Sequence, residues 1–232
     1  MRHHLTSLRG GHDLMAATLP RRHSFGEELA NSITHGVGAA LSIAALVTLL
    51  VYSANYQDPW RAVGFSIYGA ALFLLYLAST LYHSFSGTKI KSIFRLLDHS
   101  SIFLLIAGTY TPVTLIAMRG PWGWTLFGLI WGLAAAGVLF KLFFTGRFPA
   151  VSLGFYAAMG WIALIAIHPM LAMLPTGLLL WIIAGGLFYT CGTAFYVWKS
   201  LPYHHAVWHV FVLAGSIAHF SGILYYLSRS AA

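Results

Sequence analysis

The chain has 232 residues, of which 59% are hydrophobic and only 8% are charged, and its formal net charge is +8. Soluble globular domains carry roughly 25% charged residues, so the composition excludes that class and indicates an integral membrane protein. A basic chain can also bind nucleic acid. Here, however, the positive charges follow the pattern of a membrane protein, described below, and we expect no nucleic-acid partner.

Seven apolar stretches are long enough to cross a membrane as helices, since each helical residue advances about 1.5 Å across a hydrocarbon core about 30 Å thick. Residues 1–23 form a polar arm without the apolar core of a signal peptide, and we expect this arm to be disordered. Short loops leave no room for a second domain, so residues 24–229 are assigned to one all-α, seven-helix bundle. The predicted spans are 32–54, 61–83, 99–118, 122–144, 150–173, 176–198 and 206–227.

The lysines and arginines predict how the bundle lies in the membrane. With seven spans, ten of them fall on the side of the N-terminus and three on the other side. An excess of Lys and Arg marks the cytoplasmic face. We therefore expect a multi-pass protein of the cell membrane with its N-terminus in the cytoplasm and its C-terminus outside.

Ionisable and polar residues gather at the cytoplasmic ends of four predicted spans. They are Glu28, Asn31 and His35 before and within the first span, His83 at the end of the second, Asp98 before the third, and His205 and His209 at the start of the seventh. Such groups are costly to place in a membrane and mark a functional site by default. The sequence therefore predicts one polar site sunk into the cytoplasmic end of the bundle.

Three of these histidines suit a metal ion. His205 and His209 are four residues apart, so their side chains lie on one helix face, one turn apart, and can reach a common ion. His83 supplies a third ligand from another helix, and three protein ligands with an open fourth position are typical of catalytic zinc. The alternative is an interfacial histidine pair without a ligand.

Asp98 has two possible places in such a site: it could ligate the ion directly, or hold a water at the metal and take its proton. Its alternative role is a surface ion pair with Lys91 or Arg95. Ser79 lies one turn before His83 and could hydrogen-bond the water or a substrate carbonyl, or simply ease helix packing.

Glu28, Asn31 and Thr34 follow one another at intervals of three residues and form a stripe next to His35. They indicate either the polar, capped start of the first helix or a hydrogen-bond network that orients the ligand histidines.

Two further features fall in the apolar runs. His219 is expected to be a hydrogen-bonded interior residue or part of a polar path, whereas His168 is expected at the opposite membrane face. The segment 109–112, Thr-Tyr-Thr-Pro, should kink the third helix, with threonine hydroxyls satisfying the freed carbonyls.

Four motifs in this order resemble the progestin and adipoQ receptor family, and the length and short loops resemble its bacterial branch, the hemolysin III family. The motifs are Glu28-x-x-Asn31-x-x-Thr34-His35, Ser79-x-x-x-His83, Leu97-Asp98-x-Ser100, and His205-x-x-x-His209 followed by Ala218-His219-Phe220. The resemblance covers roughly residues 22–228, and His99 departs from the aromatic residue expected after the aspartate.

The resemblance implies that His83, His205 and His209 ligate zinc, that Asp98 contacts it through water, and that the protein resides in a bacterial membrane. It also implies a relation to alkaline ceramidases, within a wider group of membrane metal-dependent hydrolases. The leading hypothesis is a zinc-dependent hydrolase of lipid amide or ester bonds at the cytoplasmic leaflet, with an apolar cavity beneath the metal for an acyl chain.

Two alternatives remain open. One is a receptor-like regulator of membrane state that binds lipid as a ligand and uses zinc to tie its helices together. The other is a pore-forming cytolysin, as the family name implies, although the outer half of the predicted bundle offers few polar residues for a pore.

Overall fold

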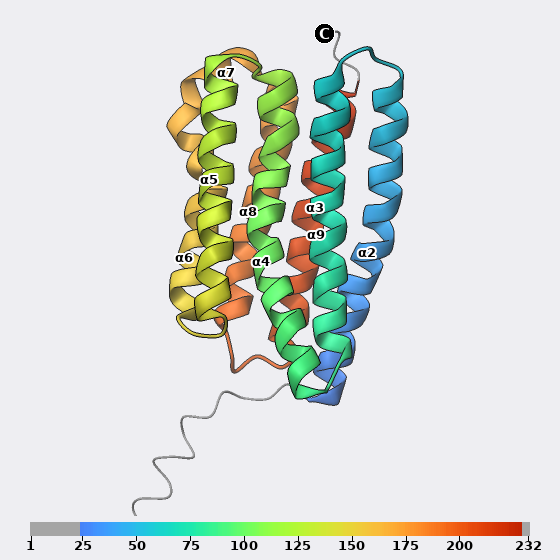
Figure 1. Cartoon of the computed structure of the whole chain (residues 1–232), viewed down its shortest axis with the longest axis vertical. Coiled ribbons are helices and arrows are strands. Elements are labelled where there is room, and N and C mark those ends of the chain that lie inside the picture. The colour runs from blue at the N-terminus through green and yellow to red at the C-terminus, as the bar shows by residue number, and fades with distance from the viewer. Residues whose placement is uncertain (1–23, 229–232) are drawn as a thin grey trace, which may run out of the picture.

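The computed structural model describes residues 24–228, and these form only helices and the turns between them. Seven helical units in this part of the chain are long and apolar enough to cross a membrane. They stand side by side in an upright bundle (Figure 1), which confirms the predicted fold. The elements are α2 (Phe25–Ala54), α3 (Pro59–Ser84), α4 (Thr88–Pro112), η1 (Val113–Ala117), α5 (Pro121–Phe144), α6 (Pro149–Gly160), η2 (Ile162–Ala166), α7 (Ile167–Met173), α8 (Thr176–Val197), α9 (His204–Gly222) and η3 (Ile223–Leu227).

Helix starts follow local chemistry. The Ser24 side chain accepts the Glu27 N–H while the Glu27 carboxylate accepts the Ser24 N–H, a capping box that begins α2. The Asp58 side chain likewise caps α3 by accepting the Trp60 N–H. Helices α3, α5 and α6 each have a proline in the first turn, where its missing N–H leaves no bond unmade.

Two predicted helix starts were too late. The first helix begins at Phe25 rather than at residue 32, because the capping box nucleates it before the apolar run. The third helix begins at Thr88 rather than at residue 99, so Asp98 lies well inside α4 and not at its mouth. Hydropathy detects the part of a helix that lies in lipid, whereas backbone hydrogen bonds continue into a polar segment.

The predicted irregularity near Pro112 is present. Helix α4 ends at Pro112 and continues as the π-helical segment η1. The hydroxyls of Thr109, Thr111 and Thr114 donate to backbone carbonyls in the preceding turns. The fifth span is also interrupted, since the 3-10 segment η2 separates α6 from α7.

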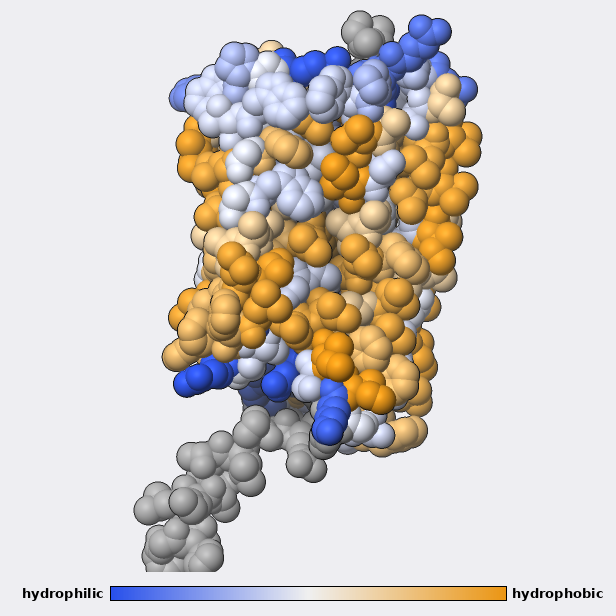
Figure 2. Space-filling view, in the orientation of Figure 1, coloured by the Kyte–Doolittle hydropathy of each residue, from blue (hydrophilic) through white to orange (hydrophobic). Residues whose placement is uncertain are grey.

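Helix α9 packs against both α2 and α8, and α3 packs between α2 and α4. Close approach depends on small residues: a Cβ on Gly38 of α2 would lie 2.5 Å from the Tyr76 ring of α3. Large apolar side chains cover the outside of the bundle, where Figure 2 shows a broad hydrophobic belt between two more polar ends. Such a surface suits lipid, and the protein is a multi-pass membrane protein.

Basic residues lie mainly at one end of the bundle, the end at which α3 ends and α9 begins, which we call the basic end. Of the eight lysines and arginines in the described range, six lie there and two at the opposite end. The six are Lys89, Lys91, Arg95, Lys141, Arg147 and Lys199, and the two are Arg61 and Arg119. By the positive-inside rule this asymmetry predicts that the basic end faces the cytoplasm.

Candidate metal centre

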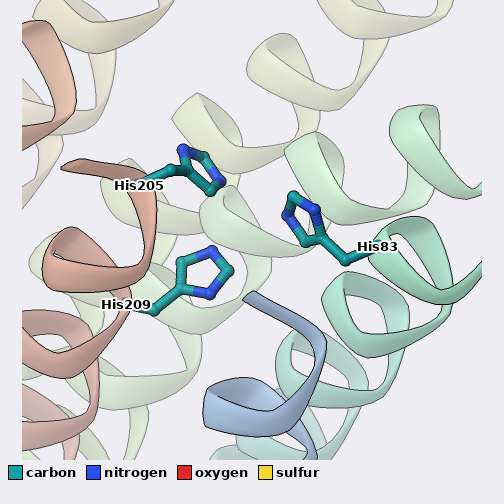
Figure 3. Close-up of side chains that lie close together, drawn as sticks. All are labelled: His83, His205 and His209. Atoms are coloured by element: carbon teal, nitrogen blue, oxygen red, sulfur yellow. The ribbon is translucent and has the colours of Figure 1, made fainter. Parts of the chain in front are cut away.

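Three histidines meet at the basic end of the bundle. His83 comes from the last turn of α3, and His205 and His209 come from the first two turns of α9. Their rings face a common space between the two helices (Figure 3). The structure thus brings together three residues that the sequence predicted as ligands, although more than 120 positions separate His83 from His205.

The spacing suits a metal ion. One ring nitrogen from each histidine lies within 4.8 Å of the others. Two nitrogens bound to one tetrahedral zinc are about 3.4 Å apart, given bonds of about 2.0–2.1 Å. Small rotations of the side chains close this difference. A donor set of three imidazoles is one that zinc and other late transition metals favour.

His209 has one nitrogen engaged and one left for a ligand. Its Nδ1 lies 3.2 Å from the carbonyl oxygen of Asn31 and 3.2 Å from the Thr34 hydroxyl oxygen. That hydroxyl donates to the carbonyls of Ala30 and Asn31, so it accepts from the imidazole, and Nδ1 carries the proton. Nε2 then presents its lone pair, and this buried atom has no hydrogen-bond partner in the described chain. A bound cation would satisfy it.

His83 is oriented by a carboxylate. Its Nδ1 donates to Glu28 Oε2 at 2.5 Å, and the other carboxylate oxygen accepts from Lys91 Nζ at 2.6 Å. Glu28 is an acceptor only, so Nδ1 carries the proton and Nε2 is the nitrogen available to a metal. A carboxylate on the far nitrogen of a ligand histidine fixes its tautomer and makes it a stronger ligand.

Asn31 and His35 complete the wall formed by α2. The Asn31 amide nitrogen lies 3.4 Å from His83 Nδ1. The His35 ring stacks on His209 with centroids 3.4 Å apart and the planes 10° from parallel. Of the two interpretations of this polar stripe, these contacts match the hydrogen-bond network, and its role in orienting metal ligands stays a prediction. Glu27, not Glu28, caps the helix.

Asp98 lies beside the three histidines and is not part of their cluster. Its side chain is 13% exposed, and Oδ2 lies 3.5 Å from His99 Nδ1. The predicted alternative was a surface ion pair with Lys91 or Arg95. Lys91 pairs with Glu28, and within residues 24–228 no ion pair joins Asp98 to Arg95. Asp98 instead lines a cavity of about 170 Å³ that His83 and His205 also line.

This cavity differs from the one that the sequence led us to expect. We expected an apolar cavity beneath the metal, whereas the cavity that contacts the histidines also reaches the loop residues Gly146 and Lys199 at the basic end. Three tyrosines and the lysine of α5 contribute to its wall. These residues are Tyr82, Tyr156, Tyr196 and Lys141.

The remaining predicted residues fall in several places. Ser79 is buried on α3 one turn before His83, and its role stays a prediction. The interior role of His219 is confirmed, as its Nε2 donates to the Ile182 carbonyl at 3.0 Å. His168 is exposed and lies on α7, whereas the three histidines of the candidate metal centre lie at the end of α3 and the start of α9. The sequence did not predict Lys141 as a site residue. The pattern that could have indicated it is a single cation inside the apolar run 122–144.

Comparison with known proteins places this chain in a family. Residues 23–220 match the family described as Haemolysin-III related. The chain belongs to this family. Every residue of the candidate centre, from Glu28 to His209, lies within the matched range.

Family relatives occur in bacteria and in animals. The chain is 48% identical to the "Hemolysin-3 homolog" of Bacillus subtilis (strain 168) over 200 residues, which cover 86% of this chain and 94% of the relative. It is 47% identical to "Hemolysin-3" of Bacillus cereus over 205 residues, 88% of this chain and 94% of the relative. It is 31% identical to the human "Monocyte to macrophage differentiation factor" over 212 residues, 88% of this chain and 86% of the relative.

Proposed function

We propose that this member of the haemolysin-III-related family is a zinc-dependent hydrolase of lipid amide or ester bonds, acting at the cytoplasmic leaflet. The observation that carries the proposal is the pairing of a three-histidine cluster with a cavity. His83 and His205 belong to both, and the same cavity holds the carboxylate of Asp98. Three protein ligands beside an accessible space are typical of catalytic zinc, whereas structural zinc sites are usually closed by four.

Zinc at this cluster would lower the pKa of a bound water towards about 7 and polarise a substrate carbonyl. The chain's own residues hold and orient the ligands for this task. Glu28 fixes the tautomer of His83, and the Asn31 carbonyl fixes that of His209. His35 packs flat on His209 and limits its rotation.

Asp98 is the proposed general base, because it is the carboxylate that lines the cavity beside the histidines. It accepts the proton of the attacking water and returns it to the leaving group. Ser79, buried one turn deeper than His83, donates a hydrogen bond to the substrate oxygen as negative charge develops. The lipid reaches the site from the membrane that surrounds the bundle.

Metal analysis tests the ligand set. We expect about one zinc per chain in protein purified without chelator, and its loss in His205→Ala and His209→Ala. His168→Ala removes an exposed histidine from α7 and is the matched control, which should keep its zinc. Elemental analysis of each variant provides the measurement. Wild-type protein without stoichiometric metal would overturn the proposal.

A second measurement separates a catalytic from a structural zinc. Asp98→Asn keeps the size and hydrogen-bonding ability of the side chain but removes the proton acceptor. Zinc content should be retained while the hydrolysis of lipid amides or esters falls by about 10²–10⁴-fold, the usual contribution of a general base. A variant with full zinc and full activity would exclude Asp98. If wild-type protein holds zinc but has no turnover on any lipid amide or ester, a zinc that only ties α3 to α9 is the better account.

A further inference from the structure

The cavity beside the three histidines has an excess of positive charge. Its lining contains three cationic side chains, Lys141, Arg147 and Lys199, and one carboxylate, Asp98. A divalent cation at the histidine cluster would add to this excess. A cavity lined by charge of one sign attracts ligands of the opposite sign.

Arg147 and Lys199 lie in exposed loops, where the positive-inside rule accounts for them. Lys141 is different, because it lies within α5 and is only 1% exposed. A lysine that merely reached for water from the end of a membrane helix would keep its ammonium group exposed. Burial of this group therefore calls for a specific explanation.

The surroundings of Lys141 are polar but do not neutralise it. Its Nζ donates to the Ser152 hydroxyl of α6 and lies 5.7 Å from the centre of the Tyr156 ring. In residues 24–228 no carboxylate lies within ion-pair distance of Nζ, and Asp98 instead lies next to His99. Asp98 lines the same cavity and attracts Lys141 only from beyond ion-pair distance. A buried ammonium without a direct counter-charge costs several kcal/mol. An anion that enters the cavity would supply that counter-charge.

We propose that this cavity binds the phosphate group of an anionic lipid, with Lys141 as the deep contact and Arg147 and Lys199 at the rim. The cavity reaches Gly146, in the loop between α5 and α6, and Pro149, the first residue of α6, so it lies at the end of the bundle, where lipid phosphates are expected. Lysine binds phosphate as a point charge, and the hydroxyls of Tyr82 and Tyr196 in the lining add donors.

The size of the cavity limits which part of the lipid enters. Its volume of about 170 Å³ is close to that of an engineered protein cavity, about 150 Å³, that holds one benzene molecule. A phosphate-bearing head group fits this space and an acyl chain does not. This inference rests on the proposed function in one respect: it makes a phosphate-bearing lipid the substrate class of the hydrolase.

Binding, rather than turnover, tests the inference. The full chain in nanodiscs of phosphatidylcholine is titrated with phosphatidic acid, and retained lipid is measured by native mass spectrometry. Wild-type protein should select phosphatidic acid over phosphatidylcholine. Lys141→Met, of similar length but uncharged, should weaken that binding roughly 10- to 100-fold, the effect of one charge-assisted hydrogen bond. Lys89→Met removes an exposed lysine at the same end, outside the cavity lining, and should bind as wild type.

A second variant keeps the inference testable if Lys141→Met fails to fold. Arg147→Gln combined with Lys199→Gln changes only exposed rim positions and should weaken binding as well. Competition with inorganic phosphate distinguishes a site for a lipid head group from a site for free phosphate. If phosphate fails to displace the lipid, other parts of the lipid contribute to binding. If low millimolar phosphate displaces it, the site binds free phosphate. Binding of phosphatidic acid by Lys141→Met at wild-type strength, or equal retention of phosphatidylcholine by wild type, would overturn the inference.

The same titration is repeated with Asp98→Asn and with protein stripped of metal by chelator. If the hydrolase proposal is wrong, lipid selection should persist in all of these samples without any turnover. If the phosphate site is wrong and the hydrolase is right, neutral lipids should be cleaved and Lys141→Met should cleave them at the wild-type rate. The two failures are therefore distinguishable.

Discussion

At the scale of single residues, Glu28 links the polar start of α2 to the candidate metal. Its carboxylate holds His83 Nδ1 at 2.5 Å and Lys91 Nζ at 2.6 Å, while its own side chain is only 22% exposed. A charged acceptor on the far nitrogen increases the electron density at Nε2, which is the nitrogen that faces His205 and His209.

Glu28→Gln should therefore weaken metal binding about 10- to 100-fold, because an amide still accepts a hydrogen bond but no longer carries charge. The measurement is the zinc affinity of purified protein in competition with a chelator of known strength. Glu27→Gln is the control, since it removes the same charge from the adjacent capping residue, whose carboxylate accepts from the backbone N–H groups of Ser24 and Tyr203. Equal effects of the two changes would mean that Glu28 acts through helix stability.

The sequence identified the three histidines and Glu28 because membrane helices contain few ionisable groups and the topology forces these to one end. It did not identify the ion pair between Glu28 and Lys91, because Lys91 lies on a turn of α4 that precedes the apolar run. Lys141 was counted only among the charges that orient the protein. Its burial depends on the Ser152 side chain of α6, which no local pattern on α5 can show.

At the scale of elements, a charged clamp joins three helical segments at the end opposite the metal centre. Asp58, which caps α3, accepts from Arg119 and lies 3.7 Å from Arg61 Nε. Arg61 is 1% exposed and also donates to the Leu227 carbonyl at the end of η3. The clamp thus ties the start of α3 to the end of the seventh span and to the link between η1 and α5.

Asp58→Asn should lower stability substantially, by about 3 kcal/mol, because it leaves the buried Arg61 guanidinium without its carboxylate. Arg119→Ala should have a smaller effect, within about 1 kcal/mol, since the Arg119 side chain is 43% exposed. Thermal unfolding midpoints in detergent compare the two variants. Both should keep the zinc of wild type, and a loss of metal in Asp58→Asn would show that the two ends are coupled.

The sequence predicted the existence of every spanning helix but not all of their ends. Hydropathy cannot register the polar turns from Thr88 to Leu97, which belong to α4, a helix that packs against α3. The Pro112 irregularity was predictable from one residue, since proline cannot make the helical hydrogen bond. The break at η2 was not, since residues 162–166 are an uninterrupted apolar run without proline or glycine.

At the scale of the whole molecule, the metal centre depends on orientation, because its parts come from helices that cross the membrane in opposite directions. Helix α3 ends at the side where α9 begins, so an even number of spans, four, separates these two ends, and one span miscounted between them would place His83 and His205 on opposite sides. The structure meets this condition with its seven spans. Which side of the bilayer the centre faces follows from charge alone, with six of eight described lysines and arginines at the basic end.

Cysteine labelling of intact cells tests that orientation. Cys191, the single native cysteine, is exposed, so it is first replaced by alanine. Ser86→Cys then marks the exposed loop between α3 and α4 at the basic end, and Gln57→Cys marks the exposed loop between α2 and α3 at the opposite end. A membrane-impermeant maleimide should label Gln57→Cys in intact cells but label Ser86→Cys only after permeabilisation. The reverse pattern would place the metal centre at the outer leaflet. Labelling of both cysteines from one side would contradict the seven-span topology, on which the contact between His83 and α9 depends.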